Sequence, residues 1–220
     1  MLGGLRRLAA VFLFCLAASP VVEIRAAEKS DVNIVIALDC SWSVSSVEYA
    51  LQIKGISRAL RDPAVVAAIS GGTHGRISLL LTQWATASHQ MVVLPWTTIT
   101  NSIEASAFAL RVAQVPRAMI AGGTSLSGAL LHANRQLAAA PLEAERDVID
   151  LVTDGDNNNG PKVQPVRDSI IAEGTTINAL AITNENENLV DYLVFNIIGG
   201  PGAFVEPAVN YRRFAAAFRK

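Results

Sequence analysis

Short, nearly continuous apolar runs that alternate with alanine- and leucine-rich stretches constrain the fold of this chain more than any other feature. The clearest runs are Asn33–Leu38 (NIVIAL) and Val148–Thr153 (VIDLVT). They are rich in β-branched residues, as expected of strands that are covered on both faces. Repeated strand–helix units give a parallel sheet with helices on both sides. We therefore predict a three-layer α/β fold with a mostly parallel central sheet.

The remaining segments continue this alternation. Further strands are predicted at Arg76–Trp84, Gln90–Trp96, Thr176–Ile182 and Ala203–Val205, the first two as a hairpin. Helices are predicted at Ser45–Leu60, Ile103–Val112, Leu126–Ala139, Val166–Glu173 and Leu189–Ile197. A last helix is predicted from an apolar face that packs on the sheet and is made by Tyr211, Phe214, Ala215 and Phe218.

The first 26 residues have the pattern of a secretory signal peptide. Two arginines precede an uncharged apolar run at Leu8–Ala18, and small residues follow at the predicted cleavage point, after Ala26. A membrane span needs about 20 apolar residues, and Pro20 interrupts this run too early. We therefore predict a protein exported to the periplasm or beyond, with a single domain at 27–220 and no stable membrane anchor.

Removal of this leader changes the charge and the thiol content of the chain. The leader contains three arginines and one glutamate, so the formal net charge falls from −1 to −3 without it. Mild acidity argues against binding to nucleic acid or to an anionic membrane surface. Only Cys40 remains, so the core must hold the fold without an internal disulfide. We expect Cys40 to be a small buried residue rather than a nucleophile.

Oxygen-bearing side chains follow the predicted strands, at the end of the sheet where ligands collect in such folds. Asp39, Ser41 and Ser43 follow the first long strand at alternate positions, so their side chains can converge. Asp154 follows a later strand, and Thr124 stands in a loop that begins with two glycines. Carboxylates and hydroxyls, without His or Cys at the matching places, are hard ligands that suit Mg²⁺ or Mn²⁺.

These residues resemble the metal-ion-dependent adhesion site of a von Willebrand factor A domain. The resemblance rests on D-x-S-x-S after the first strand, a Thr in a glycine-led loop and the Asp of a T-D-G turn. It covers Asp31–Lys220 and extends to small exported bacterial A-domain proteins of unassigned function. It implies a non-enzymatic binding module whose divalent cation captures an exposed Asp or Glu of a partner protein. The implied metal ligands, direct or through water, are Asp39, Ser41, Ser43, Thr124 and Asp154.

Other interpretations of the same residues remain open. Asp39 could be the nucleophile of a metal-dependent phosphohydrolase, although haloacid-dehalogenase-like phosphatases carry a second Asp where Ser41 stands. Alternatively, Asp39 and Asp154 could simply cap helices. The domain could also be a structural one whose site has lost its metal. The run 154–160 begins like a calcium loop but lacks the Gly and the Glu that such a loop requires. Trp42 could contact a partner or pack beside the site.

Overall fold

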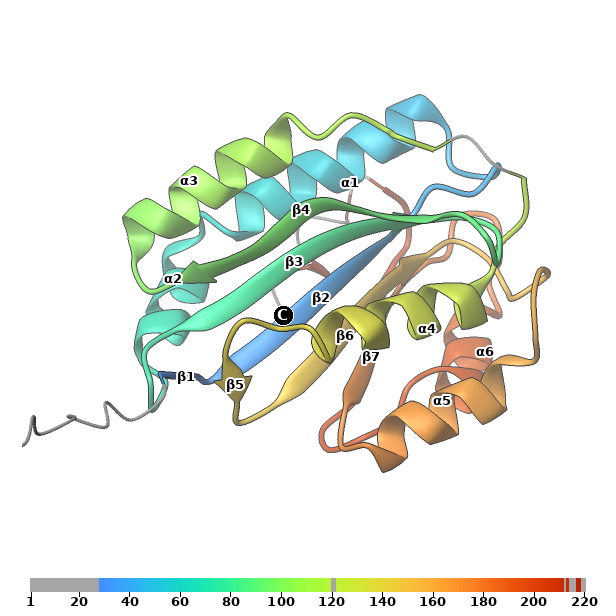
Figure 1. Ribbon diagram of the computed structural model, residues 1–220. Helices are drawn as coiled ribbons and strands as arrows, with labels where there is room; N and C mark the ends of the chain where they lie inside the picture. The colour runs from blue at the N-terminus through green and yellow to red at the C-terminus, as the bar shows by residue number, and fades with distance from the viewer. Residues whose placement is uncertain (1–27, 120–121, 212, 214–216, 219–220) are drawn as a thin grey trace, which may run out of the picture.

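The computed structural model describes residues 28–119, 122–211, 213 and 217–218. These residues form a central sheet with helices on both faces (Figure 1). The strands of this sheet are β2 (Val32–Asp39), β3 (Ile77–Trp84), β4 (Gln90–Ile99), β6 (Asp147–Thr153), β7 (Thr176–Ile182) and β8 (Val205–Ala208). The helices are α1 (Ser46–Ala59), α2 (Pro63–Ser70), α3 (Ser102–Ala113), α4 (Leu126–Leu137), α5 (Val163–Ala172) and α6 (Leu189–Asn196). Two short strands, β1 (Lys29–Ser30) and β5 (Glu143–Ala144), pair outside this sheet.

The order of the strands confirms the predicted mostly parallel α/β sheet. The order is β4-β3-β2-β6-β7-β8, and each neighbouring pair is parallel except the hairpin of β3 and β4. From β2 the chain passes through α1 to β3 on one side, and it later returns to β6 on the other side. The carboxyl ends of β2 and β6 therefore meet at a topological switch point, which is where ligands bind in open α/β sheets.

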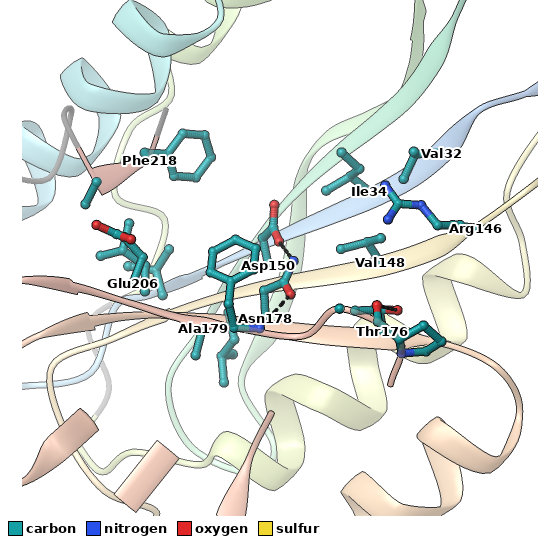
Figure 2. Close-up of a pocket in the computed structure, with 17 residues that line it drawn as sticks. Val32, Ile34, Arg146, Val148, Asp150, Thr176, Asn178, Ala179, Glu206 and Phe218 are labelled. Atoms are coloured by element: carbon teal, nitrogen blue, oxygen red, sulfur yellow. Dashed lines mark hydrogen bonds between the residues drawn. The ribbon is translucent and has the colours of Figure 1, made fainter. Parts of the chain in front are cut away.

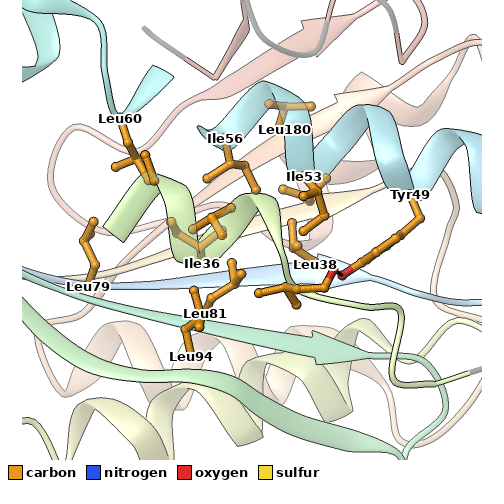
Figure 3. Packing of buried hydrophobic residues seen from close by; sticks show 14 of the residues in the cluster. Ile36, Leu38, Tyr49, Ile53, Ile56, Leu60, Leu79, Leu81, Leu94 and Leu180 are labelled. Carbon is orange, nitrogen blue, oxygen red and sulfur yellow. Dashed lines mark hydrogen bonds between the residues drawn. The ribbon is translucent and has the colours of Figure 1, made fainter. Parts of the chain in front are cut away.

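Alternate residues of the central strands fill two separate cores. Ile36 and Leu38 of β2 point into the first core, which α1 and α3 cover, whereas Val35 and Ala37 point into the second. Figure 3 shows Ile53 and Ile56 of α1 in the first core, together with Ile36 and Leu38. Helices α4, α5 and α6 cover the second core. Two buried faces explain why the sequence of β2 is almost entirely apolar.

The five helices predicted between Ser45 and Ile197 are confirmed, with shifts at their ends. Ser45 and Glu48 form both hydrogen bonds of a capping box at the start of α1. The sequence prediction missed α2, although Asp62 caps it and Pro63 occupies its first turn, because α2 is only 8 residues long. The predicted strand at Ala203–Val205 is wrong in its bounds, since β8 begins at Val205, where pairing with β7 begins.

Parts of the two ends of the chain lie outside the described residues. They include the predicted leader and, from the predicted last helix, Phe214 and Ala215. Tyr211 is buried in the first core and Phe218 packs against it, which agrees with the predicted packing on the sheet. None of the helices in the described part of the chain is long and apolar enough to span a membrane.

Candidate metal centre

The carboxylate of Asp39 lies at the centre of the predicted site. Asp39 is the last residue of β2 and is fully buried. Its Oδ1 accepts a hydrogen bond of 2.7 Å from the backbone N–H of Ser41, and its Oδ2 accepts one of 2.8 Å from the hydroxyl of Thr153. Thr153 ends β6, so this bond joins the carboxyl ends of the two strands at the switch point.

A chain of hydrogen bonds connects the two serines with the second carboxylate. The hydroxyl oxygens of Ser41 and Ser43 are 3.2 Å apart, and the Ser43 hydroxyl donates to Asp154 Oδ1 at 2.7 Å. The alternate positions of the serines after β2 turn both hydroxyls toward the loop that follows β6. The structure thus brings together Asp39, Ser41, Ser43 and Asp154, as the sequence predicted.

Thr124 reaches the same place from the loop before α4. Its backbone N–H donates to Asn158 Oδ1 at 2.8 Å, and its carbonyl accepts from the Asn158 N–H at 2.9 Å. Its hydroxyl lies 3.8 Å from the position that a Cβ on Gly155 would take, next to Asp154. Gly123 has a φ of +97°, a conformation that favours glycine and turns the chain into α4. All five predicted ligand residues therefore lie around one site.

Three residues that support this site were not predicted as part of it. Thr153 could have been found, because it is the Thr of the T-D-G turn. Arg117 donates from Nη2 to the carbonyls of Cys40 and Ser41, at 3.0 and 2.9 Å, and so fixes the loop after β2. The Tyr211 hydroxyl donates to Asp154 Oδ2 at 2.8 Å. No sequence motif marks either of these two contacts.

The electrostatics of the site favour a bound cation. Burial, together with the nearby charge of Asp154, raises the pKa of Asp39 to about 7. Among the described residues, neither carboxylate forms an ion pair with a basic side chain. Two adjacent carboxylates without a counter-charge repel each other, and a divalent cation between them would remove that repulsion. The donor set of two carboxylates and three hydroxyls therefore fits a hard divalent cation.

One side of the site opens to solvent. Ser43 is exposed, and Trp42 beside it is 80% exposed. The Trp42 ring lies over Gly122, because a Cβ on Gly122 would stand 3.2 Å from Trp42 Cε3. Cys40 is buried, as predicted, and burial raises the pKa of its thiol to about 12. A partner could therefore reach the site beside Ser43 and Trp42 but could not reach Cys40.

Comparisons with known proteins give a family and a fold. A family model described as "Protein of unknown function (DUF1194)" matches residues 29–220. No curated protein shows significant sequence similarity to the chain.

Similar solved structures confirm the von Willebrand factor A fold. Proximal thread matrix protein 1 from the mussel byssus has a TM-score of 0.66 at 15% identity, over 86% of this chain and 46% of its own. A second structure of that protein, described as having a zinc-occupied MIDAS (metal-ion-dependent adhesion site) motif, has a TM-score of 0.59 at 17% identity, over 86% and 47%. A von Willebrand factor type A protein from Catenulispora acidiphila has a TM-score of 0.57 at 17% identity, over 87% of this chain and 41% of its own. Manganese-loaded TRAP protein from Plasmodium vivax has a TM-score of 0.55 at 15% identity, over 88% of this chain and 73% of its own. The chain thus spans less than half of the mussel and Catenulispora proteins.

Proposed function

Because the chain belongs to the family described as "Protein of unknown function (DUF1194)" and has a von Willebrand factor A fold, we propose that it is a metal-dependent protein-binding module. In this proposal a divalent cation captures an acidic group of a partner protein outside the cytoplasm. The observation that carries the proposal is the convergence of five oxygen-bearing side chains from three loops at the switch point of the sheet.

The proposed ligands of the cation are Asp39, Ser41, Ser43, Thr124 and Asp154, directly or through water. Mg²⁺ or Mn²⁺ suits this set, because both are hard cations that prefer oxygen ligands. The zinc in the mussel protein and the manganese in the Plasmodium protein support a divalent cation at such a site. A bound Mg²⁺ usually keeps several waters, so a carboxylate from a partner can replace one of them.

The environment of Asp39 favours binding over the alternative of a phosphohydrolase. A nucleophilic carboxylate needs an oxygen that can reach a phosphorus atom. Asp39 is fully buried, and both of its oxygens accept hydrogen bonds, from Ser41 and from Thr153. The exposed groups at the opening are Ser43 and Trp42, which can contact a partner beside the metal. Trp42 would add apolar contact area to the charge interaction.

The proposed export rests on the signal-peptide pattern of the first 26 residues. Mass spectrometry of the protein purified from a periplasmic extract tests it. We expect the mature chain to begin at Ala27, and an intact leader on protein found only in the cytoplasm would contradict it. The metal site and the export are tested independently, so either can fail alone.

Titration calorimetry of the purified protein with Mg²⁺ and Mn²⁺ tests the metal site. We expect saturable binding by the wild type and none by Asp39→Ala or Asp154→Ala. The matched control is Asp156→Ala, which removes an exposed carboxylate two residues from Asp154 and outside the proposed set. Absence of metal binding by a folded wild-type protein would refute the proposed function.

A pull-down from periplasmic or extracellular extract tests capture of a partner. We expect a partner that is retained with Mg²⁺, released by chelator and not retained by the Asp154→Ala variant. A phosphatase activity that disappears in Asp39→Asn would instead favour the enzyme.

A further inference from the structure

A cavity lies on the sheet face of the first core, over β6, β7 and β8. It has a volume of about 240 Å³ (Figure 2). Its apolar walls include Ile34, Val148, Val152, Leu180, Phe204 and Phe218. None of the five proposed metal ligands lines it. The cavity is therefore a separate feature from the candidate metal centre.

A polar pair occupies the middle of this apolar cavity. Asp150 of β6 and Asn178 of β7 are partners in the parallel register, and both line the cavity. Asp150 Oδ1 accepts a hydrogen bond of 2.9 Å from Asn178 Nδ2, and Asn178 Oδ1 accepts one of 3.4 Å from the N–H of Phe204. Figure 2 shows this pair between the apolar side chains. A carboxylate in the middle of a central strand is costly unless a charged or donor group compensates it.

The groups that the structure describes around Asp150 do not supply that compensation. Within the described residues, no basic side chain forms an ion pair with Asp150, and its bonded partner is a neutral amide. Arg146 lines the cavity at the end beside Val32 and Ile34, whereas Glu206 lines the opposite end (Figure 2). Burial raises the pKa of Asp150, as expected for a carboxyl group that lacks a cationic partner. The middle of the cavity, at Asp150, thus attracts positive charge.

We propose that this cavity binds a compact organic cation, with an ammonium or guanidinium head on Asp150 and an apolar body against the cavity walls. The head donates to Asp150 and points away from Arg146, and the body lies along Val148 and its register partner Ile34. Pockets for drug-sized ligands are typically about 300–1,000 Å³, so a volume of about 240 Å³ selects a smaller ligand. This site needs no metal and stands apart from the proposed capture of a partner.

Binding of benzylammonium and of benzyl alcohol, which have similar shape but different charge, tests the proposal. Both compounds are titrated into the purified protein in the presence of chelator. Binding is measured by calorimetry and by the NMR signals of the Asn178 side-chain amide. We expect saturable binding of benzylammonium and affinity for benzyl alcohol that is weaker by about tenfold or more, since charge-assisted hydrogen bonds are the stronger ones. Asp150→Asn should lose this preference for the cation.

The same strand provides a matched control. Asp147 of β6 is also bonded to an asparagine, Asn33, at 3.1 Å, but it does not line the cavity. Asp147→Asn should therefore bind benzylammonium like the wild type. Equal binding of the two compounds, or no saturable binding of either, would overturn the proposal. An equal loss of benzylammonium binding in Asp150→Asn and Asp147→Asn would overturn it too. If Asp150→Asn does not fold, wild-type titration without a shift of the Asn178 amide signals overturns it as well.

Discussion

Replacing Asp39 with asparagine should stabilise the protein in the absence of metal, although Asp39 is the central ligand of the proposed site. The substitution keeps the shape of the side chain and can keep its hydrogen bonds. The amide oxygen can accept from the Ser41 N–H, and the amide nitrogen can donate to the Thr153 hydroxyl. That hydroxyl has an alternative acceptor, the carbonyl of Gly155 at 3.0 Å. The main change is therefore the loss of one buried negative charge.

The pKa of Asp39 sets the size and the direction of this effect. Burial and the charge of Asp154 raise it from 3.8 to about 7, so the folded state holds the proton more tightly than the unfolded state. The stability that Asp39 contributes is present below about pH 4 and is lost as the pH rises to about 7. At about 1.4 kcal/mol for each pKa unit, the loss at pH 8 is at most about 4 kcal/mol. Asparagine escapes this loss, and its advantage falls to about 2 kcal/mol at pH 5.

Metal should reduce the stability advantage of the asparagine variant at pH 8 and reverse it at pH 5. A cation at 100 times its dissociation constant stabilises the wild type by about 2.7 kcal/mol, because it binds only the folded state. The asparagine variant should gain little, since it lacks one of the two carboxylates of the site. The difference in unfolding free energy between the two proteins should therefore shrink or change sign when Mg²⁺ replaces chelator.

Urea unfolding of the wild type and Asp39→Asn tests these expectations. The free energy of unfolding of each protein is measured at pH 8 and pH 5, in chelator and in excess Mg²⁺. Asp156→Asn is the control, because it removes an exposed carboxylate near the site without removing a proposed ligand. The reasoning is refuted if Asp39→Asn is less stable than the wild type in chelator at pH 8. It is also refuted if Mg²⁺ stabilises both proteins equally.

Three further predictions follow from single contacts. Tyr211→Phe removes the 2.8 Å hydrogen bond to Asp154 and should lower the unfolding free energy in urea by about 1 kcal/mol and weaken Mg²⁺ binding in calorimetry; unchanged values in both assays would contradict this. Trp42→Ala should reduce retention of a partner in the pull-down but leave Mg²⁺ affinity unchanged, whereas Phe195→Ala, which removes a ring that is 76% exposed on α6, should change neither. Cys40 should resist a thiol reagent in the native protein and react in urea, and rapid labelling of the native protein would show that its loop opens.

The sequence predicted the parts of the site that depend on local geometry. Asp39, Ser41 and Ser43 are two residues apart after a strand, so their convergence follows from the alternation of side chains in an extended segment. Asp154 could be placed because parallel strands bring their carboxyl ends to one edge of the sheet. Thr124 follows α3 rather than a parallel strand, and its place in the ligand set came from the resemblance of its glycine-led loop to the adhesion site.

The supporting contacts could not be predicted, because they depend on tertiary packing. Arg117 stands 77 residues from Cys40 in the sequence, and its guanidinium reaches the loop from the segment that follows α3, which packs on α1. The pattern of apolar residues assigned Tyr211 to a helix face, which explains its burial but not the hydrogen bond of its hydroxyl to Asp154. Helix α2 was missed for a different reason. It is only 8 residues long, and so short a helix does not show a clear helical period in its apolar residues.

Asp39 and Asp150 show why a carboxylate in the sheet has to be interpreted together with its place on the strand. Asp39 ends β2, where the next loop supplies a backbone N–H and where a second carboxylate stands nearby, so a metal ion is the counter-charge that fits. Asp150 stands in the middle of β6, where both neighbouring strands continue, and among the described residues its hydrogen-bond partner is the side chain of Asn178. Such a position cannot gather the several oxygen ligands that a hard cation requires, but a single ammonium or guanidinium group can satisfy it. The apolar run VIDLVT contains this exception in its third residue, and under our proposal this charge within an apolar strand is the sequence feature that marks the ligand site.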